Sequence, residues 1–144
     1  MTAYAIAALR NTTVPNEEVF DYMERIQSTL DPFGGRFLVH GAQPEDIEGS
    51  WPGGVVVISF PDKAAAHGWY DSDAYQELIP LRTRNLDGEV IFVEGVPEGY
   101  DPSSTAARMR AEAGRGRVRR GPGAAPTVMP GAERRAAPRA PLLG

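Results

Sequence analysis

Cysteine is absent from this chain of 144 residues. Its absence excludes a disulfide framework, a thiolate nucleophile and any metal site with cysteine ligands, and it is consistent with a reducing compartment. Long hydrophobic runs are missing too, because the apolar N-terminal segment meets polar residues within ten positions and has no basic residue before it. That segment is too short to span a membrane and lacks the charged start of a signal peptide. We therefore expect a cytoplasmic protein with no membrane partner.

Other signatures of chemistry are also missing. The chain has no glycine-rich phosphate loop between a strand and a helix and no GxSxG sequence. It also has no Ser/His/Asp set whose spacing indicates a catalytic triad. His40 and His67 are the two histidines, and the acids that follow His40 have no repeated ligand spacing. We therefore expect no metal ion and no bound cofactor.

Positive charge is scarce in the first part of the chain. Residues 1–99 carry six basic and 16 acidic side chains, a net charge of −10, whereas residues 100–144 carry nine basic and three acidic ones, a net charge of +6. The second segment is rich in Gly, Pro and Ala, so it cannot bury enough apolar surface to offset the entropy of ordering. We expect a folded domain over 1–97 and a mostly disordered tail over 98–144, with a short helix at 103–113.

Turn residues divide the domain into four strands and two helical regions. The strands are predicted at 3–10, 36–40, 55–60 and 90–94. Asn16, followed by two acids, predicts the start of a helix whose apolar residues recur every three or four positions as far as Leu30. The second helical region starts at Pro61, restarts at a new N-cap, Ser72, and continues to Leu86.

The order β-α-β-β-α-β is typical of the ferredoxin-like α+β sandwich, an antiparallel sheet with both helices on one face. The other face of that sheet then carries Val, Ile, Phe and Tyr side chains without a cover. Exposing a mostly apolar sheet face forfeits about 25 cal/mol per Å². We therefore expect a second copy to cover it, which gives an isologous homodimer through the sheet face.

Several short segments, taken in their order and spacing, resemble the DUF1330 family, whose members are small proteins of the dimeric α/β-barrel group. The segments are Ala3-Tyr4, Leu30–Arg36, Gly49–Trp51, Phe60-Pro61, Trp69–Ser72, Tyr75-Gln76, Leu81-Arg82 and Val93–Gly95. The resemblance covers residues 1–96 and implies a βαββαβ protomer that pairs through its sheet. Relatives with this barrel include cofactor-free monooxygenases, isomerases, polyketide cyclases and haem-binding enzymes, but a fold does not determine a function.

Four candidate site residues are expected on the face turned away from the helices, in a cavity between the sheet and its partner. They are Tyr4, Arg36, His40 and Glu94. His40 and Glu94 are the catalytic candidates, because an imidazole and a carboxylate in an apolar cavity can move a proton. Structural alternatives stay open, since Arg36 could pair with Glu94 or Glu89 and His40 ends its strand at solvent.

The other candidates would bind the substrate. Arg82, which matches the family pattern, joins Arg36 as an anion anchor, with a salt bridge to nearby acids as the alternative. Trp51, in a loop rich in Gly and Pro, is either a lid over the cavity or a plug on a small hydrophobic cluster. Trp69 and Tyr75 flank the junction of the two helical parts and, with Tyr4, would line the cavity.

Two functional hypotheses follow. In the first, the homodimer binds a small polar metabolite and acts on it without a cofactor, as an isomerase, a cyclase or a monooxygenase. In the second, it is a non-catalytic binding or assembly module whose tail recognises a partner. The tail arginines have no aromatic residues among them for base stacking, so we expect no specific nucleic-acid partner. The sequence does not identify the ligand.

Overall fold

The structure of the protein, a computed structural model, describes residues 1–120, and for the end of this range, 117–120, only the backbone. Residues 1–95 form one compact unit, and residues 96–120 belong to a second one. Within the described part of the chain, no helix is long and apolar enough to cross a membrane.

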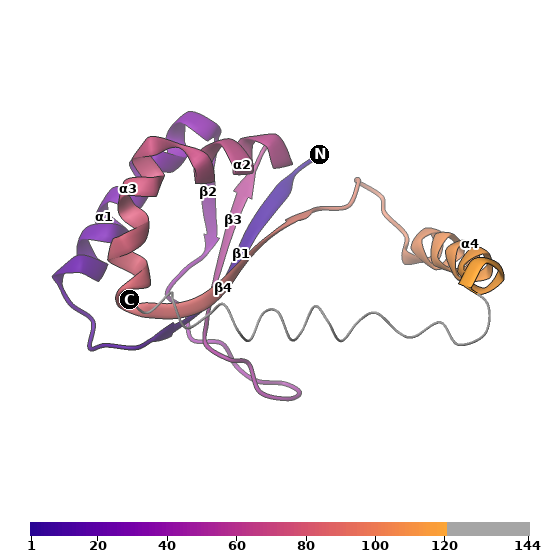
Figure 1. Cartoon of the computed structure of the whole chain (residues 1–144), viewed down its shortest axis with the longest axis horizontal. Coiled ribbons are helices and arrows are strands. Elements are labelled where there is room, and N and C mark those ends of the chain that lie inside the picture. The colour runs from indigo at the N-terminus through magenta and orange to yellow at the C-terminus, as the bar shows by residue number, and fades with distance from the viewer. Residues whose placement is uncertain (121–144) are drawn as a thin grey trace. The chain divides into compact units, whose positions relative to one another are not determined.

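The compact unit has one sheet and one layer of helices. Its elements are β1 (Ala3–Asn11), α1 (Glu17–Leu30), the 3-10 helix η1 (Asp31–Phe33), β2 (Arg36–Val39), β3 (Gly54–Phe60), α2 (Lys63–Asp71), α3 (Asp73–Thr83) and β4 (Leu86–Glu94). The strands form an antiparallel sheet in the order β2-β3-β1-β4, and the three α-helices lie on one face of it (Figure 1). The predicted ferredoxin-like α+β fold is confirmed.

Local signals set the helix starts as predicted. Asn16 caps α1, because its side-chain oxygen accepts a hydrogen bond from the backbone N–H of Glu18 at 3.0 Å. Ser72 ends α2 and caps α3, and its hydroxyl accepts a hydrogen bond from the backbone N–H of Tyr75 at 3.3 Å. The predicted break in the second helical region is therefore confirmed, and it turns the chain into two short helices.

The end of α3 differs from the prediction. Leu86, predicted as the last residue of the helix, pairs with Asn11 and opens β4. Asn85, just before it, is buried, and its side-chain amide donates a hydrogen bond to the backbone oxygen of Leu81 at 2.9 Å. This bond satisfies one of the carbonyls that a helix end leaves free, so the helix stops here and the strand begins.

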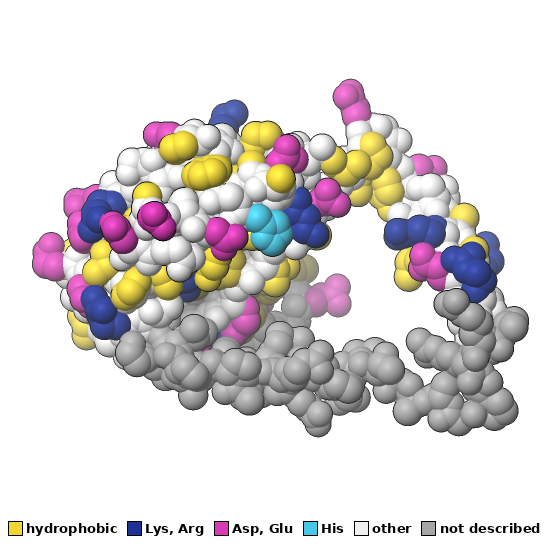
Figure 2. All heavy atoms as spheres, turned by 45° about the horizontal axis from the view of Figure 1, so that its top comes forward, with side chains coloured by type: hydrophobic (Ala, Val, Ile, Leu, Met, Phe, Trp, Pro, Cys, Tyr) yellow, Lys and Arg dark blue, Asp and Glu magenta, His cyan; other side chains and the backbone are white. Residues whose placement is uncertain are grey.

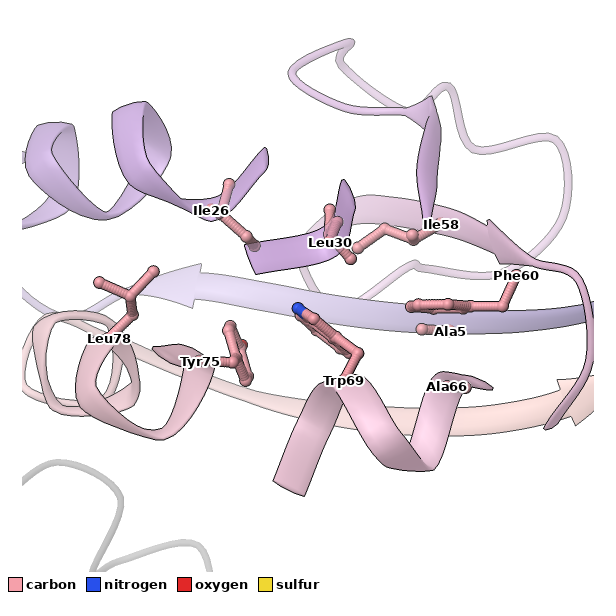
Figure 3. Packing of buried hydrophobic residues seen from close by; sticks show 9 residues of the cluster. All are labelled: Ala5, Ile26, Leu30, Ile58, Phe60, Ala66, Trp69, Tyr75 and Leu78. Atoms are coloured by element: carbon pink, nitrogen blue, oxygen red, sulfur yellow. The ribbon is translucent and has the colours of Figure 1, made fainter. Parts of the chain in front are cut away.

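The hydrophobic core lies between the helices and the sheet. The residues at its centre are Ala5, Ile26, Leu30, Ile58, Phe60, Ala66, Trp69, Tyr75 and Leu78 (Figure 3). The rings of Trp69 and Tyr75 lie 4.0 Å apart between centroids. The indole N–H of Trp69 donates a hydrogen bond to the hydroxyl of Thr29 at 3.0 Å. The aromatic residues at the predicted helix junction are thus part of the core.

No helix of residues 1–95 covers the opposite side of the sheet (Figure 1). We call it the open face, and its apolar members are Tyr4, Ile6, Val39, Val55, Val57, Ile91 and Val93. Ile6 pairs with Val57 on one side and with Ile91 on the other. These three side chains therefore lie side by side across the centre of the sheet, and Ile91 is 54% exposed.

The second unit contains α4 (Pro102–Arg120). This helix continues past the predicted end at residue 113, and its basic side chains are prominent in Figure 2. Arginine is a good helix former, and it makes up much of the extension despite two glycines there. The rest of the tail predicted to be disordered, 121–144, lies outside the described residues.

Candidate functional site

The compact unit contains a partly open cavity of about 100 Å³ between its sheet and its helices. Ala5 and Ala7 of β1 and Ile58 of β3 form its floor, and Val19 and Ile26 of α1 lie in its wall. Side chains alternate along a strand, so Ala5 and Ala7 both point toward the helices. Because both are small, they leave space where larger side chains would fill the core.

Five of the side chains that line this cavity carry polar atoms, and the others are apolar. The five are Tyr22, His40, Trp69, Tyr75 and Arg82. The Trp69 N–H already donates to a hydroxyl in the core, which leaves two phenols, one imidazole and one guanidinium for a ligand. Among the described residues, no group of three or more His, Cys, Asp or Glu side chains could hold a metal ion.

The two phenols lie against each other. The hydroxyl oxygens of Tyr22 and Tyr75 are 2.7 Å apart, a hydrogen bond between α1 and α3. Burial raises the pKa of Tyr22 well above its ordinary value, and the neighbouring Tyr75 raises it further, although Arg82 acts in the opposite direction. Tyr22 is therefore a neutral hydrogen-bonding group and not a phenolate.

Arg82 is a buried charge without a carboxylate. Its side chain is 6% exposed, its Nε atom is buried and has no hydrogen-bond partner, and no ion pair in the described part of the chain includes it. Burial lowers the pKa of Arg82, but the phenols of Tyr75 and Tyr22 raise it by more, so the pKa lies above its ordinary value. The guanidinium is thus always charged in this site.

A hydrogen-bond network holds the turn of α3 that carries this charge. The side-chain oxygen of Asn85 accepts hydrogen bonds from the hydroxyl of Thr13 at 2.9 Å and from the amide of Asn16 at 2.8 Å. The Asn85 amide donates to Glu18 at 3.0 Å, and Arg84 donates to the same carboxylate. The network ties the segment before α1 to the end of α3, and so closes one end of the helix layer over the sheet.

The eight predicted site residues do not all meet. Those at the cavity under the helices are His40, Trp69, Tyr75 and Arg82. Tyr4 and Arg36 lie on the open face, because both pair with Ser59. Arg36 is exposed, and no ion pair within the described residues includes it. The predicted grouping on the face away from the helices thus holds for two residues only.

The predicted face of His40 is wrong. Regular alternation would place it on the open face, but the pairing of β2 with β3 shifts between Phe37 and Val39. Leu38 is the extra residue of this bulge, and an extra residue reverses the faces of those that follow. The ring of His40 packs against Phe37, with 5.1 Å between centroids, and lines the cavity under the helices.

The predicted face of Glu94 is wrong as well. Glu94 pairs with Ala3, whose side chain is fully buried on the helix side of the sheet. The alternation predicted within β4 is correct, but the strand faces the other way, because Phe92 packs against the core. Glu94 is exposed and does not line the cavity.

Trp51 lies in an exposed loop. Its backbone N–H donates a hydrogen bond to Asp46 at 3.2 Å, and its indole N–H donates to the backbone oxygen of Gly54 at 3.4 Å. It lines a polar hollow at the surface, beside Arg10, and does not line the cavity under the helices. Its role as a lid stays a prediction.

Two residues of the site were missed by sequence reasoning. Tyr22 belongs to the apolar stripe of α1, and nothing in that pattern shows that its hydroxyl meets Tyr75 of a distant helix. Asn85 falls within a segment predicted as helix. An Asn that follows basic residues and precedes an apolar strand is a helix-end signal that could have revealed it.

A four-stranded antiparallel sheet with helices on one face defines this protein as a ferredoxin-like α+β domain. The chain belongs to the family described as Domain of unknown function (DUF1330), whose sequence profile matches residues 2–96. The resemblance seen in the sequence is thereby confirmed. No curated protein matches the chain significantly.

Solved structures are similar to this chain. RPA0582 of Rhodopseudomonas palustris, a protein of unknown function, has a TM-score of 0.55 and 16% identity over 67% of this chain and 83% of its own. SnoaB of Streptomyces nogalater, a cofactor-independent oxygenase, has a TM-score of 0.49 and 12% identity over 69% and 98%. A dimeric ferredoxin-like protein of unknown function from Jannaschia has a TM-score of 0.46 and 16% identity over 66% and 100%. At such identities the likeness concerns the fold alone.

Proposed function

We propose that the protein binds a small, mostly apolar organic molecule in the cavity between its sheet and its helices. The observation that carries this proposal is a partly open pocket of about 100 Å³ with a largely apolar lining. Protein cores are close-packed and contain few voids larger than a water molecule. An enclosed apolar cavity of about 150 Å³ holds benzene. This smaller pocket therefore suits a short chain, or a single ring of which part lies in the open mouth.

We also propose that two copies pair through the open face. The support is the row of β-branched side chains at the centre of the sheet, with Ile91 54% and Val93 42% exposed. Pairing as an isologous homodimer would cover the same row on both copies. The cavity lies on the other side of the sheet, so each protomer would keep a complete site of its own.

The chemistry that this lining supports best is a cofactor-free proton transfer, as in an isomerisation. Imidazole is the side chain that most often takes and returns protons in enzymes, and His40 lines the cavity while Glu94 does not. We assign the acid and base role to His40 alone. A non-catalytic binding protein would use the same cavity. If the wild type turns over a ligand and the His40→Gln variant turns it over equally fast, the acid and base role of His40 is wrong.

The test of ligand binding uses four probes of suitable size: butyrate, butyramide, benzoate and benzamide. Ala7 points into the cavity, whereas Ala8, the next residue of β1, pairs with Val55 on the open face. We expect calorimetry to detect one bound probe per protomer for at least one of the four. The Ala7→Leu variant should weaken that binding by on the order of tenfold or more, because the larger side chain fills the space.

The control is Ala8→Leu, which adds the same atoms to the same strand on the other face and should leave the affinity for the probe unchanged. Native mass spectrometry of the purified protein adds an independent readout, a bound mass that Ala7→Leu loses. If none of the four probes binds, or if Ala7→Leu binds as the wild type does, the proposal is wrong.

A further inference from the structure

The arginines of the compact unit differ in how their charge is balanced. Arg10, Arg25 and Arg84 each lie beside a carboxylate, for example at 2.9 Å between Arg10 and Glu89. Arg82 is buried and has no such partner within the described residues. Taking a charge out of water without a counter-ion costs several kcal/mol. A fold that retains such a charge in the wall of a cavity has a place for an anion there.

The donors around Arg82 match one carboxylate group. Its Nε atom has no acceptor in the protein but is also out of reach of a ligand, so the N–H groups on its two Nη atoms are the ones that can donate to a ligand in the cavity. The hydroxyls of Tyr22 and Tyr75 share one hydrogen bond, which uses one of their two hydrogens and leaves the other for a ligand. A guanidinium and a phenol can thus donate to the two oxygens of a carboxylate, and hydrogen bonds to a charged partner are the stronger kind.

The rest of the lining limits the ligand further. Arg82 is the one permanently charged side chain that lines the described cavity, so a dianion such as phosphate would keep one charge uncompensated in an apolar space. A cation would be repelled by the positive charge of the guanidinium. The walls away from Arg82 are formed by alanine, valine, leucine and isoleucine side chains, and these suit a hydrocarbon body.

We infer that the cavity takes a small monocarboxylate, with a short aliphatic chain or a single ring, held by Arg82 together with the hydroxyls of Tyr22 and Tyr75. This inference rests on the proposed function, because it names the class of molecule that occupies the same cavity. It also assigns Tyr22 to the binding site.

A stability measurement separates this role from a structural one. Arg82→Met keeps the unbranched stem of the side chain as far as the position of Nε and removes the rest of the guanidinium with its charge. If Arg82 serves the ligand, its removal takes away a buried charge that has phenols beside it but no counter-ion among the described residues, so the ligand-free variant should unfold at the same temperature as the wild type or at a higher one. If Arg82 instead holds the fold together through the tyrosines, the unfolding temperature of the ligand-free variant will fall.

The binding measurement compares each acid with its amide, benzoate with benzamide and butyrate with butyramide. We expect the wild type to prefer the acids by roughly tenfold or more, and Arg82→Met to abolish that preference. Unchanged affinity of the variant for benzamide would show that its cavity is intact. Tyr22→Phe should reduce the preference by a smaller factor, because a phenol donates one neutral hydrogen bond.

The matched control is Arg84→Met, which removes an exposed arginine two positions away and should leave the preference for acids in place. The inference is overturned if amides bind the wild type as tightly as acids, if Arg82→Met keeps the preference, or if this variant loses stability without ligand. If the amides still bind, each of these results refutes the carboxylate site but not the proposed binding of small molecules in the cavity. Absence of binding by all four probes would instead remove the proposed function and the inference with it.

Discussion

The two faces of the sheet carry similar apolar side chains but use them differently. Toward the helices, Ala5, Ile58 and Phe60 are buried in the core. On the open face, Ile91 and Val93 are exposed in the single chain. Alternation along the strands gives both faces the same kind of surface, so the composition of a strand does not reveal its use. The difference comes from the helix layer, which covers one face only.

This difference decides where a ligand can be held. A pocket needs walls, and the helices supply them on one face, where alanines on β1 leave the space unfilled. The open face is a broad surface that only another molecule can cover. The sequence alone suggested a site between two sheets. The structure instead supports a division of tasks, with a ligand under the helices and a partner on the open face.

The largest effect should come from the helix side of the sheet. Phe60 is 1% exposed and packs against Trp69, with 5.5 Å between ring centroids. Phe60→Ala removes most of a buried ring and leaves a void, so we expect the free energy of unfolding to fall by about 3–5 kcal/mol. Urea unfolding followed by circular dichroism measures this change.

The matched variant on the open face is Val93→Ala, to be compared with Phe60→Ala. Because Val93 is 42% exposed in the protomer, its truncation should lower the free energy of unfolding by about 1 kcal/mol or less. Equal losses for Phe60→Ala and Val93→Ala would contradict the distinction between the two faces.

The next effect concerns association. Ile91 lies at the centre of the open face, beside Ile6 of β1. Ile91→Glu would place a charge from each copy in the proposed interface, where like charges cost several kcal/mol. We expect sedimentation equilibrium to show a dimer for the wild type and a folded monomer for the variant. Ala74→Glu, which adds a charge at an exposed position of α3, should stay dimeric, and a monomeric wild type would refute the pairing.

The smallest effect concerns the closure of the helix layer at Glu18. Arg84 and then Asn85 donate hydrogen bonds to this carboxylate, and these bonds lower the pKa of Glu18. A lowered pKa in the folded state means that the contact stabilises the fold above the ordinary pKa of Glu and that this stability is lost as the pH falls through the lowered value. Glu18→Gln should therefore destabilise the protein slightly at pH 7 and not at acid pH.

Urea midpoints at neutral and acid pH measure that difference. Because Glu18 is at the surface, the loss of stability in Glu18→Gln should be smaller than the effects of Phe60→Ala and Ile91→Glu. Added salt should reduce it further. A variant that is less stable than the wild type by the same amount at both pH values would show that the contact acts through packing and not through charge.

The parts of the fold that depend on neighbouring residues in the chain were predictable. Asn16 and Ser72 marked helix starts by their capping chemistry, and both caps are present. The antiparallel sheet with its helices on one face followed from the succession of elements. Alternation within β4 was also correctly predicted from the sequence, because it follows from backbone geometry alone.

The parts that depend on pairing between distant segments were not predictable. The bulge at Leu38, which turns His40 toward the cavity, exists only because β2 pairs with β3 in a shifted register. Glu94 was placed on the wrong face because a strand's own sequence does not say which side meets the helices when both sides are apolar. The contact of Tyr22 with Tyr75 likewise depends on how α1 packs against α3.

The most direct test of a ligand under the helices is a crystal structure of the protein soaked with benzoate. We expect one benzoate in each protomer, between β1 and the helices, with a carboxylate oxygen about 3 Å from an Nη atom of Arg82. Benzoate bound on the open face between two sheets, with the cavity under the helices empty, would contradict this expectation.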